Sequence, residues 1–184
     1  ATVVSLALEQ LGSGLGAMLP GGMPEGATVE PALCGAALSA LPGAGEDAGT
    51  AAGSGAGSAP AVAAQVAVGP QGGAVQVLAE SPRIEGARLP VDQLLAACST
   101  VTIRGADGAV TTVDLAELPV PDLGDASAGL QVTVTSGGRA VSGLVGVVVD
   151  GPRGLLLAQG GSSGAPDPGA FTALLTEAGE TAAG

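Results

Sequence analysis

Short runs of alternating apolar and polar residues, separated by turn sequences, fill the chain after residue 60. The runs Ala61–Val68 and Gly73–Glu80 flank a Gly-Pro-Gln-Gly sequence, which predicts a β-hairpin. A second pair of runs, Thr100–Arg104 and Ala109–Asp114, flanks an Asp-Gly turn. Asp-Gly between β-branched runs is a strong short-range hairpin signal, so these segments predict a second hairpin.

Three further strands are predicted in the C-terminal half, and they form a meander. Their ranges are Leu130–Thr135, Val141–Asp150 and Leu155–Gly160, with glycine-containing turns between them. The preceding segment, Leu115–Ala128, contains two prolines. Because proline cannot donate to a strand ladder, we expect that segment to be an irregular connection.

Helices are predicted at the start, in the middle and at the end of the chain. Thr2–Leu11 and Pro31–Leu41 carry apolar residues at helical spacing, and Pro90–Cys98 is a short helix. Asp167 followed by proline marks the N-cap and first residue of a closing helix. Three apolar side chains of that helix are predicted to face the core: Phe171, Leu174 and Leu175.

This order of elements predicts an α+β fold. Sequential strands joined by short turns favour an antiparallel sheet, of about five to seven strands, with helices packed on one face. We expect residues 1–184 to form a single domain. Residues 43–60, almost wholly glycine, alanine, serine and acidic residues, are predicted to be a flexible insert.

The composition narrows the possible chemistry. The chain has no histidine and no lysine, so Ser-His, Cys-His and Ser-Lys mechanisms and most zinc sites are excluded. We therefore expect a non-enzymatic protein with no cofactor and no metal site. Lysine, asparagine and tyrosine, which AT-rich codons encode, are all absent, which indicates a gene of high GC content.

The charge and hydropathy limit the partners. A formal net charge of −12 argues against binding nucleic acid or an anionic membrane surface. No stretch approaches the roughly 18 apolar residues of a spanning helix, so no transmembrane segment is predicted. We expect a monomer.

The two cysteines, Cys34 and Cys98, are predicted to form a disulfide. Their count is even, and a core with almost no aromatic residues buries little area per side chain, so a crosslink would add needed stability. The alternative is two unpaired, buried cysteines in a cytosolic protein. A redox-active pair is disfavoured, since there is no Cys-x-x-Cys spacing.

Several motifs resemble catalytic or binding sites without completing one. Residues 160–164 fit G-x-S-x-G, but no histidine exists for a triad. The arginines Arg104 and Arg139 are the best polar anchors for an anionic ligand, although each is also a typical surface residue. Four aspartates could offer oxygen ligands to Ca²⁺ but lack EF-hand spacing, so solvated loop acids are the simpler interpretation: Asp107, Asp114, Asp122 and Asp125.

A family resemblance rests on several segments in order. The chain contains PALCGAALSALP, PVDQLLAACSTVTI, DLGDASAGLQVTV, VGVVVDGPRGLLLAQGG and APDPGAFTALLTEA. Over residues 24–178 it resembles the actinobacterial extracytoplasmic sensor-domain family, which includes the external domain of a mycobacterial Ser/Thr receptor kinase and related lipoproteins. The resemblance implies a secreted or lipid-anchored domain with an antiparallel sheet, an intramolecular disulfide and a ligand-binding cleft. Only two cysteines are present, whereas such domains often have two disulfides.

The amino-acid sequence leaves three functions open. The first is an extracytoplasmic ligand-binding or sensor-like domain, whose ligand is small or lipidic. The second is a structural or protein-interaction module of the cell envelope, which would bind another protein through an exposed strand edge or helix face. The third and least favoured is a hydrolase that uses carboxylates, because 17 acidic residues nominate no particular pair.

Overall fold

The computed structural model describes residues 28–32, 34, 61–69, 72–82, 84–86, 91–161 and 164–183. Ten elements lie in these ranges: β1 (Thr28–Glu30), β2 (Ala61–Gly69), β3 (Gly72–Glu80), α3 (Val91–Cys98), β4 (Thr100–Arg104), β5 (Val110–Glu117), β6 (Ala126–Ser136), β7 (Arg139–Asp150), β8 (Arg153–Gly161) and α4 (Pro168–Ala183). The predicted helix Thr2–Leu11, most of the predicted helix Pro31–Leu41 and the predicted insert at 43–60 lie outside the described residues.

Both predicted hairpins are confirmed. Strands β2 and β3 pair along their whole length, from Ala61 opposite Glu80 to Gly69 opposite Gly72. Strands β4 and β5 pair around the Asp-Gly turn, in which Gly108 has a φ of 81° and Gly105 accepts a backbone hydrogen bond of 3.0 Å from its N–H. That positive φ is open to glycine at low cost, which explains the residue at this position.

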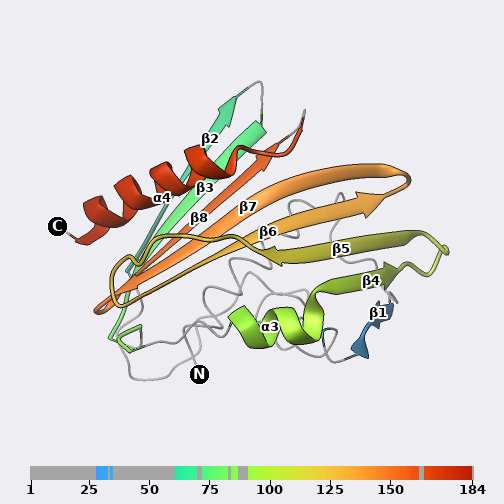
Figure 1. The fold of residues 1–184 in the computed structure, drawn as a ribbon, viewed down its shortest axis with the longest axis horizontal. Helices are drawn as coiled ribbons and strands as arrows, with labels where there is room; N and C mark the ends of the chain where they lie inside the picture. The colour runs from blue at the N-terminus through green and yellow to red at the C-terminus, as the bar shows by residue number, and fades with distance from the viewer. Residues whose placement is uncertain are drawn as a thin grey trace.

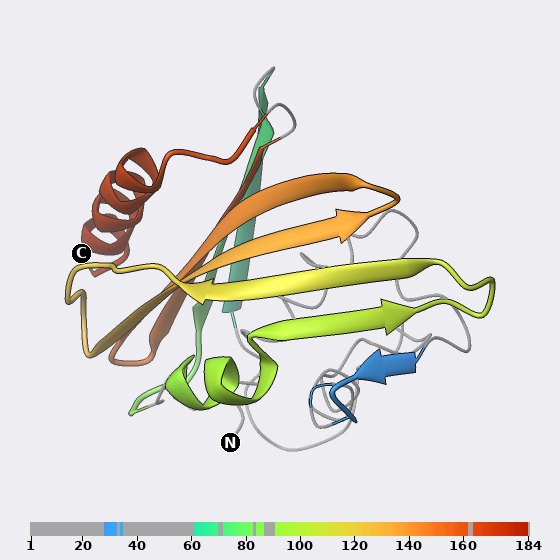
Figure 2. The same cartoon turned by 45° about the vertical axis from the view of Figure 1, so that its right-hand side comes forward.

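The described strands form one antiparallel sheet in the order β1-β4-β5-β6-β7-β8-β3-β2. The hairpins and the meander follow the sequence, but β3 pairs with β8 and β1 pairs with β4 across long stretches of chain. Figure 1 shows β2 and β1 at the two ends of the sheet. Figure 2 shows a strong twist, since β2 and β3 rise steeply in a view where β4 and β5 run across it.

The sheet is larger than the pattern of residues predicted. Strand β1 was not predicted, and it brings the strands among the described residues to eight. The segment Leu115–Ala128 was predicted to be irregular, yet β5 runs to Glu117 and β6 begins at Ala126. Cross-strand pairing with β6 extends β5, because Leu115 lies opposite Val132. The part with both prolines, residues 118–123, is irregular as expected.

The α+β class and the antiparallel sheet are confirmed, but the two described helices lie on opposite faces of the sheet instead of sharing one. In α3, Leu94 and Cys98 pack with Val132 and Val145, whereas Phe171 and Leu175 of α4 pack with Leu144. Adjacent residues of β7 point to opposite faces, so these contacts cannot lie on one side. Figure 1 shows α4 along β8 and α3 near β4.

The central strands explain this arrangement. Strand β7 contains the run Leu144-Val145, and β8 contains Leu155-Leu156-Leu157, all buried. Such continuous apolar runs present hydrophobic side chains to both faces, and each face then needs a cover. We call the side that carries α3 and the cysteines the disulfide face, and the opposite side the α4 face.

The closing helix begins as predicted. The Asp167 carboxylate accepts a 2.6 Å hydrogen bond from the Ala170 N–H, which is the geometry of an N-cap. Phe171 and Leu175, one helical turn apart, are fully buried. The prediction that Leu174 faces the core is wrong, because this side chain lies on the flank of the helix and is 41% exposed.

Candidate binding surface

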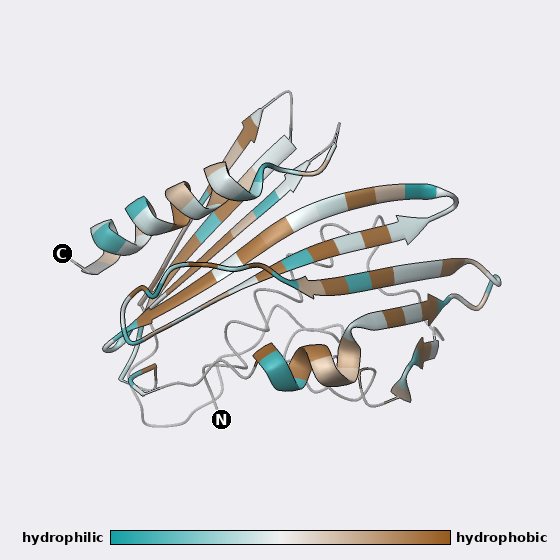
Figure 3. Ribbon diagram, viewed as in Figure 1, coloured by the Kyte–Doolittle hydropathy of each residue, from teal (hydrophilic) through white to brown (hydrophobic). Residues whose placement is uncertain are grey.

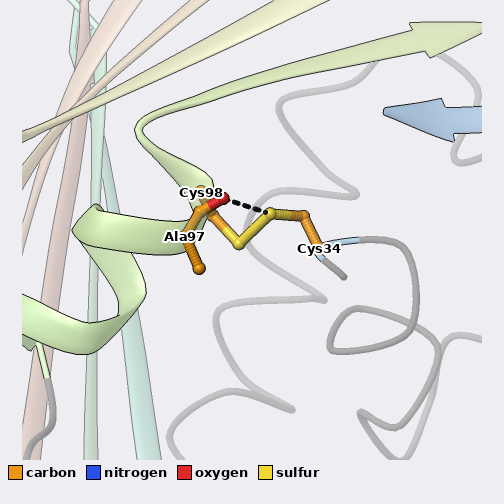
Figure 4. The surroundings of a disulfide bond; sticks show 3 residues. All are labelled: Cys34, Ala97 and Cys98. Carbon is orange, nitrogen blue, oxygen red and sulfur yellow. Dashed lines mark hydrogen bonds between the residues drawn. A yellow bond between two sulfur atoms is a disulfide. The ribbon is translucent and has the colours of Figure 1, made fainter. Parts of the chain in front are cut away.

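The predicted disulfide is present between Cys34 and Cys98 (Figure 4). The two Cα atoms are 5.7 Å apart, within the usual range for a disulfide, and the residues are separated by 64 positions in the chain. Both cysteines are buried. No free cysteine occurs, since the chain has only these two.

Cys34 is held by its neighbours as well as by the bond. Its N–H donates to the Pro31 carbonyl at 2.9 Å. Its Sγ lies 3.1 Å from the Ala97 carbonyl oxygen, the contact drawn in Figure 4. Since a disulfide sulfur carries no hydrogen, this is a close sulfur–oxygen approach. Cys34 packs in the same cluster as Val101 and Ile103, so the bond joins the N-terminal part of the chain to the disulfide face.

The aspartates named as possible calcium ligands have structural partners instead. Asp107 accepts the Ala109 N–H in the hairpin turn, and Asp114 accepts the Thr100 hydroxyl across the β4–β5 ladder at 2.9 Å. Asp125 accepts the Gly151 N–H at 2.8 Å. The structure does not bring Asp122 together with these groups into a metal site, because the described residues contain no group of three or more potential metal ligands.

The two arginines singled out as anion anchors do not converge. Arg104 on β4 forms an exposed 3.8 Å ion pair with Glu30 of β1. Arg139 is an exposed residue at the start of β7. A third arginine, Arg153, joins Glu80 at 3.7 Å and donates a 2.7 Å hydrogen bond to the Ala182 carbonyl at the end of α4. Arg104 and Arg153 thus join neighbouring elements, and the three arginines form no shared anion site.

The G-x-S-x-G sequence supplies no described catalytic group. Gly160 and Gly161 form the end of β8, where they pair with Gly73 and Gly72 of β3. The two serines at 162 and 163 lie outside the described residues.

The feature that stands out is a group of exposed valines at the β2 end of the sheet. Val66 and Val68 are 67% and 85% exposed, and Val62 and Val75 are exposed as well. Their pairing places them on one face: Val66 lies opposite Val75, and Ala64 lies opposite Val77, which packs in the disulfide-face cluster. We call Val62, Val66, Val68 and Val75 the valine surface. Figure 3 shows the hydrophobic positions continuing into β2.

Small residues border the valine surface on the same face. Val68 lies opposite Gly73, which pairs with Gly160, which in turn pairs with Gly143. Gly73 and Gly160 are half-buried and Gly143 is buried, and none of the three carries a side chain that would cover the valines. Glycines inside strands often mark sites where a ligand or another chain approaches closely. The backbone groups of these glycines belong to strands that are paired on both sides, so this area offers a ligand apolar contact with the valines and room beside them.

The pattern of residues predicted strand β2 but not the exposure of its side chains. The alternation of residues that predicts the β2–β3 hairpin is equally typical of an edge strand and of a strand covered by a neighbour. The available signal is the absence of charge, since Ala61–Gly69 contains only apolar residues, glycine and Gln65. Its position at the edge depends on the pairing of β3 with β8, which no local pattern reveals.

No protein-family model and no curated protein matches this chain significantly. Among solved structures, the chain is similar to an uncharacterized protein from Mycobacterium smegmatis, the Rv0999 ortholog. The TM-score is 0.54 at 18% sequence identity, and the match covers 97% of this chain and 96% of the other. At this identity the likeness shows a shared fold.

Proposed function

We propose that this chain is a non-enzymatic extracytoplasmic binding domain, secreted or lipid-anchored, of a high-GC actinobacterium. The buried disulfide supports an oxidising compartment, because such bonds persist outside the cytosol. None of the described helices has the length and apolar character needed to cross a membrane. The absence of histidine and lysine supports a role without acid–base catalysis.

The valine surface carries the proposal. Exposed apolar patches on a folded domain mark binding sites when their members are contiguous. Here Val66 and Val75 are direct cross-strand neighbours, and Val68 is two residues further along β2. No charged residue occurs on β2. An apolar ligand that lies along this strand therefore avoids the free-energy cost of removing water from a charged side chain. A small or lipidic molecule, such as an acyl chain, is the ligand class that fits this chemistry.

The sensor-domain resemblance supports the same proposal. In that family, an extracytoplasmic domain with an antiparallel sheet and a disulfide receives a ligand. The uncharacterized mycobacterial protein of similar fold is consistent with such an origin. We propose a sensor-like role on this basis, with the valine surface as the place of binding.

A fluorescent fatty acid, 11-(dansylamino)undecanoic acid, provides the test. It is titrated into the oxidised protein and into the double variant Val66→Ser, Val75→Ser. Loss of two apolar contacts should raise the dissociation constant about tenfold or more. Leu174→Ser on α4 is the matched control, because it also removes an exposed apolar side chain, 41% exposed, but from the opposite face. Equal binding by all three proteins, or no binding by any, would contradict the proposal.

A second function is favoured by a separate observation. The outer edge of β2 is unpaired among the described strands, and an open edge of this kind recruits protein by strand addition. The chain would then be a protein-interaction module of the cell envelope. Hydrolysis by paired carboxylates has less support, since Asp107, Asp114 and Asp125 have separate structural partners.

A further inference from the structure

The two edges of the sheet differ in how they are protected. Strand β1 has three residues and ends at Glu30, which is paired with Arg104. Strand β2 has nine residues, all exposed, and none is charged or proline. Natural proteins protect edge strands with short length, charge or proline, and β2 has none of these devices. Figure 1 shows β2 as the outermost strand at its end.

Alternate residues of β2 direct their backbone N–H and C=O groups to opposite sides of the strand, so only every second residue has these groups at the open edge. Gly69 and Gly72 flank a two-residue connection, and residues that flank such a connection form a hydrogen-bonded pair. The odd-numbered residues of β2 therefore use their N–H and C=O groups on β3. The even-numbered residues, from Val62 to Val68, direct these groups away from β3, toward the open edge.

The sequence of β2 is nearly symmetric about its centre. Read outward from Gln65, the strand Ala61–Gly69 places alanine or valine at the first position on each side, alanine at the second, valine at the third and alanine or glycine at the fourth. An antiparallel partner with the same sequence would thus meet Val62 with its own Val68, and Ala64 with its own Val66. In this register, every pair of even-numbered residues is a hydrogen-bonded pair, which gives about eight backbone hydrogen bonds between the strands.

We propose that β2 pairs with β2 of a second copy of this chain, antiparallel and centred on Gln65. The two eight-stranded sheets then form one continuous sheet, and the valine surfaces of both copies lie on the same side. On the other side, Gln65 already donates to Gln76 at 2.6 Å, and its partner's Gln65 lies next to it. A row of four glutamines would therefore cross the dimer, with each amide able to donate and accept.

We assign a second copy of this chain as the partner of β2 because the β2 edge is self-complementary and uncharged. A register shifted by two residues would put a glutamine opposite an alanine and lose the central pair. The formal net charge of −12 on each chain opposes association, but no charge lies on β2. Salt should therefore strengthen the dimer by screening the distant charges. This dimer would replace the monomer that the composition led us to expect.

A single cysteine placed on the symmetry axis tests the register. In the proposed pair, Gln65 lies opposite Gln65 of the other copy at a non-hydrogen-bonded position, where side chains are closest. Gln65→Cys should give a covalent dimer with diamide, and mass spectrometry should show that Cys34–Cys98 is retained. Gln76→Cys is the matched control, because two β3 strands would be about 14 Å apart, too far for a disulfide. Dimers from both variants, from neither, or only a bond to another protein in the exporting host would overturn the proposal.

Sedimentation equilibrium of the unmodified full chain in 0.5 M NaCl gives an independent readout. Ala64→Pro removes an outward N–H without touching the valines, and should raise the dimer dissociation constant at least tenfold. Val66→Lys, which adds an edge charge, serves the same purpose if the proline variant does not fold. A monomeric parent at 100 μM, or variants that dimerise like the parent, would overturn the proposal. Val75→Ser should leave the dimer intact, so failure of edge pairing and failure of ligand binding are separable.

Discussion

Replacing both cysteines, Cys34→Ala with Cys98→Ala, should destabilise the domain strongly. The bond joins residues 64 positions apart. On the chain-entropy account, freeing a loop of this length in the unfolded state costs about 4 kcal/mol of stability. A domain of ordinary stability has about 5–15 kcal/mol in total, so the variant would keep the fold with a reduced margin or lose it. For a chain of this size, the melting temperature should fall by about 8–16 °C.

Far-UV circular dichroism is the suitable assay, because the chain has neither tryptophan nor tyrosine for fluorescence. The parent is melted with and without a phosphine reductant, and the variant is melted under the same two conditions. The reduced parent should approach the melting temperature of the variant, and the variant should not respond to the reductant. A loss below about 1 kcal/mol, or an equal response of both proteins to the reductant, would refute the structural role of the bond.

Two further predictions concern α4, and the same melting assay checks both. Gly146→Val should cost about 1–3 kcal/mol, because a Cβ at this position would lie 2.6 Å from Leu175 Cδ2. Gly164→Ala, where a Cβ meets nothing within 4 Å, is the control and should be nearly neutral. Asp167→Ala should cost about 1 kcal/mol by removing the acceptor for the Ala170 N–H, whereas Asp167→Asn should retain most of the stability. Equal effects of the two Asp167 substitutions would contradict the capping role.

The features that could be predicted from sequence are those fixed by near neighbours or indicated by the composition. The Asp-Gly turn sets the β4–β5 hairpin, and Asp167 with the proline after it sets the start of α4. The disulfide was predicted for a different reason, the even cysteine count and the shortage of aromatic residues. The hairpin turn, the start of α4 and the disulfide each depend on local chemistry or on composition, and both can be taken directly from the sequence.

The features that could not be predicted depend on distant pairing. Strand β1 is too short to show a period, and its pairing with β4 spans the cysteine-containing segment. The close approach of α4 to the sheet depends on Gly146, where a Cβ would lie 2.6 Å from Leu175 Cδ2. The exposure of Val66 and Val68 follows from the place of β2 at the end of the strand order. Alternation alone does not distinguish these outcomes.

The pairing of β3 with β8 also sets the order in which the sheet is completed during synthesis. The β2–β3 hairpin is made early, whereas β8 is the last strand of the chain, with Gly161 pairing back to Gly72. A chain that emerges from a ribosome or an export channel therefore carries an undocked apolar hairpin until β8 follows. Non-local pairing of this kind slows folding and prolongs exposure to aggregation. Chains interrupted before residue 153 would leave β3 paired with β2 but without β8 on its other side, so we expect the yield of folded protein to depend on rapid completion of the C-terminal meander.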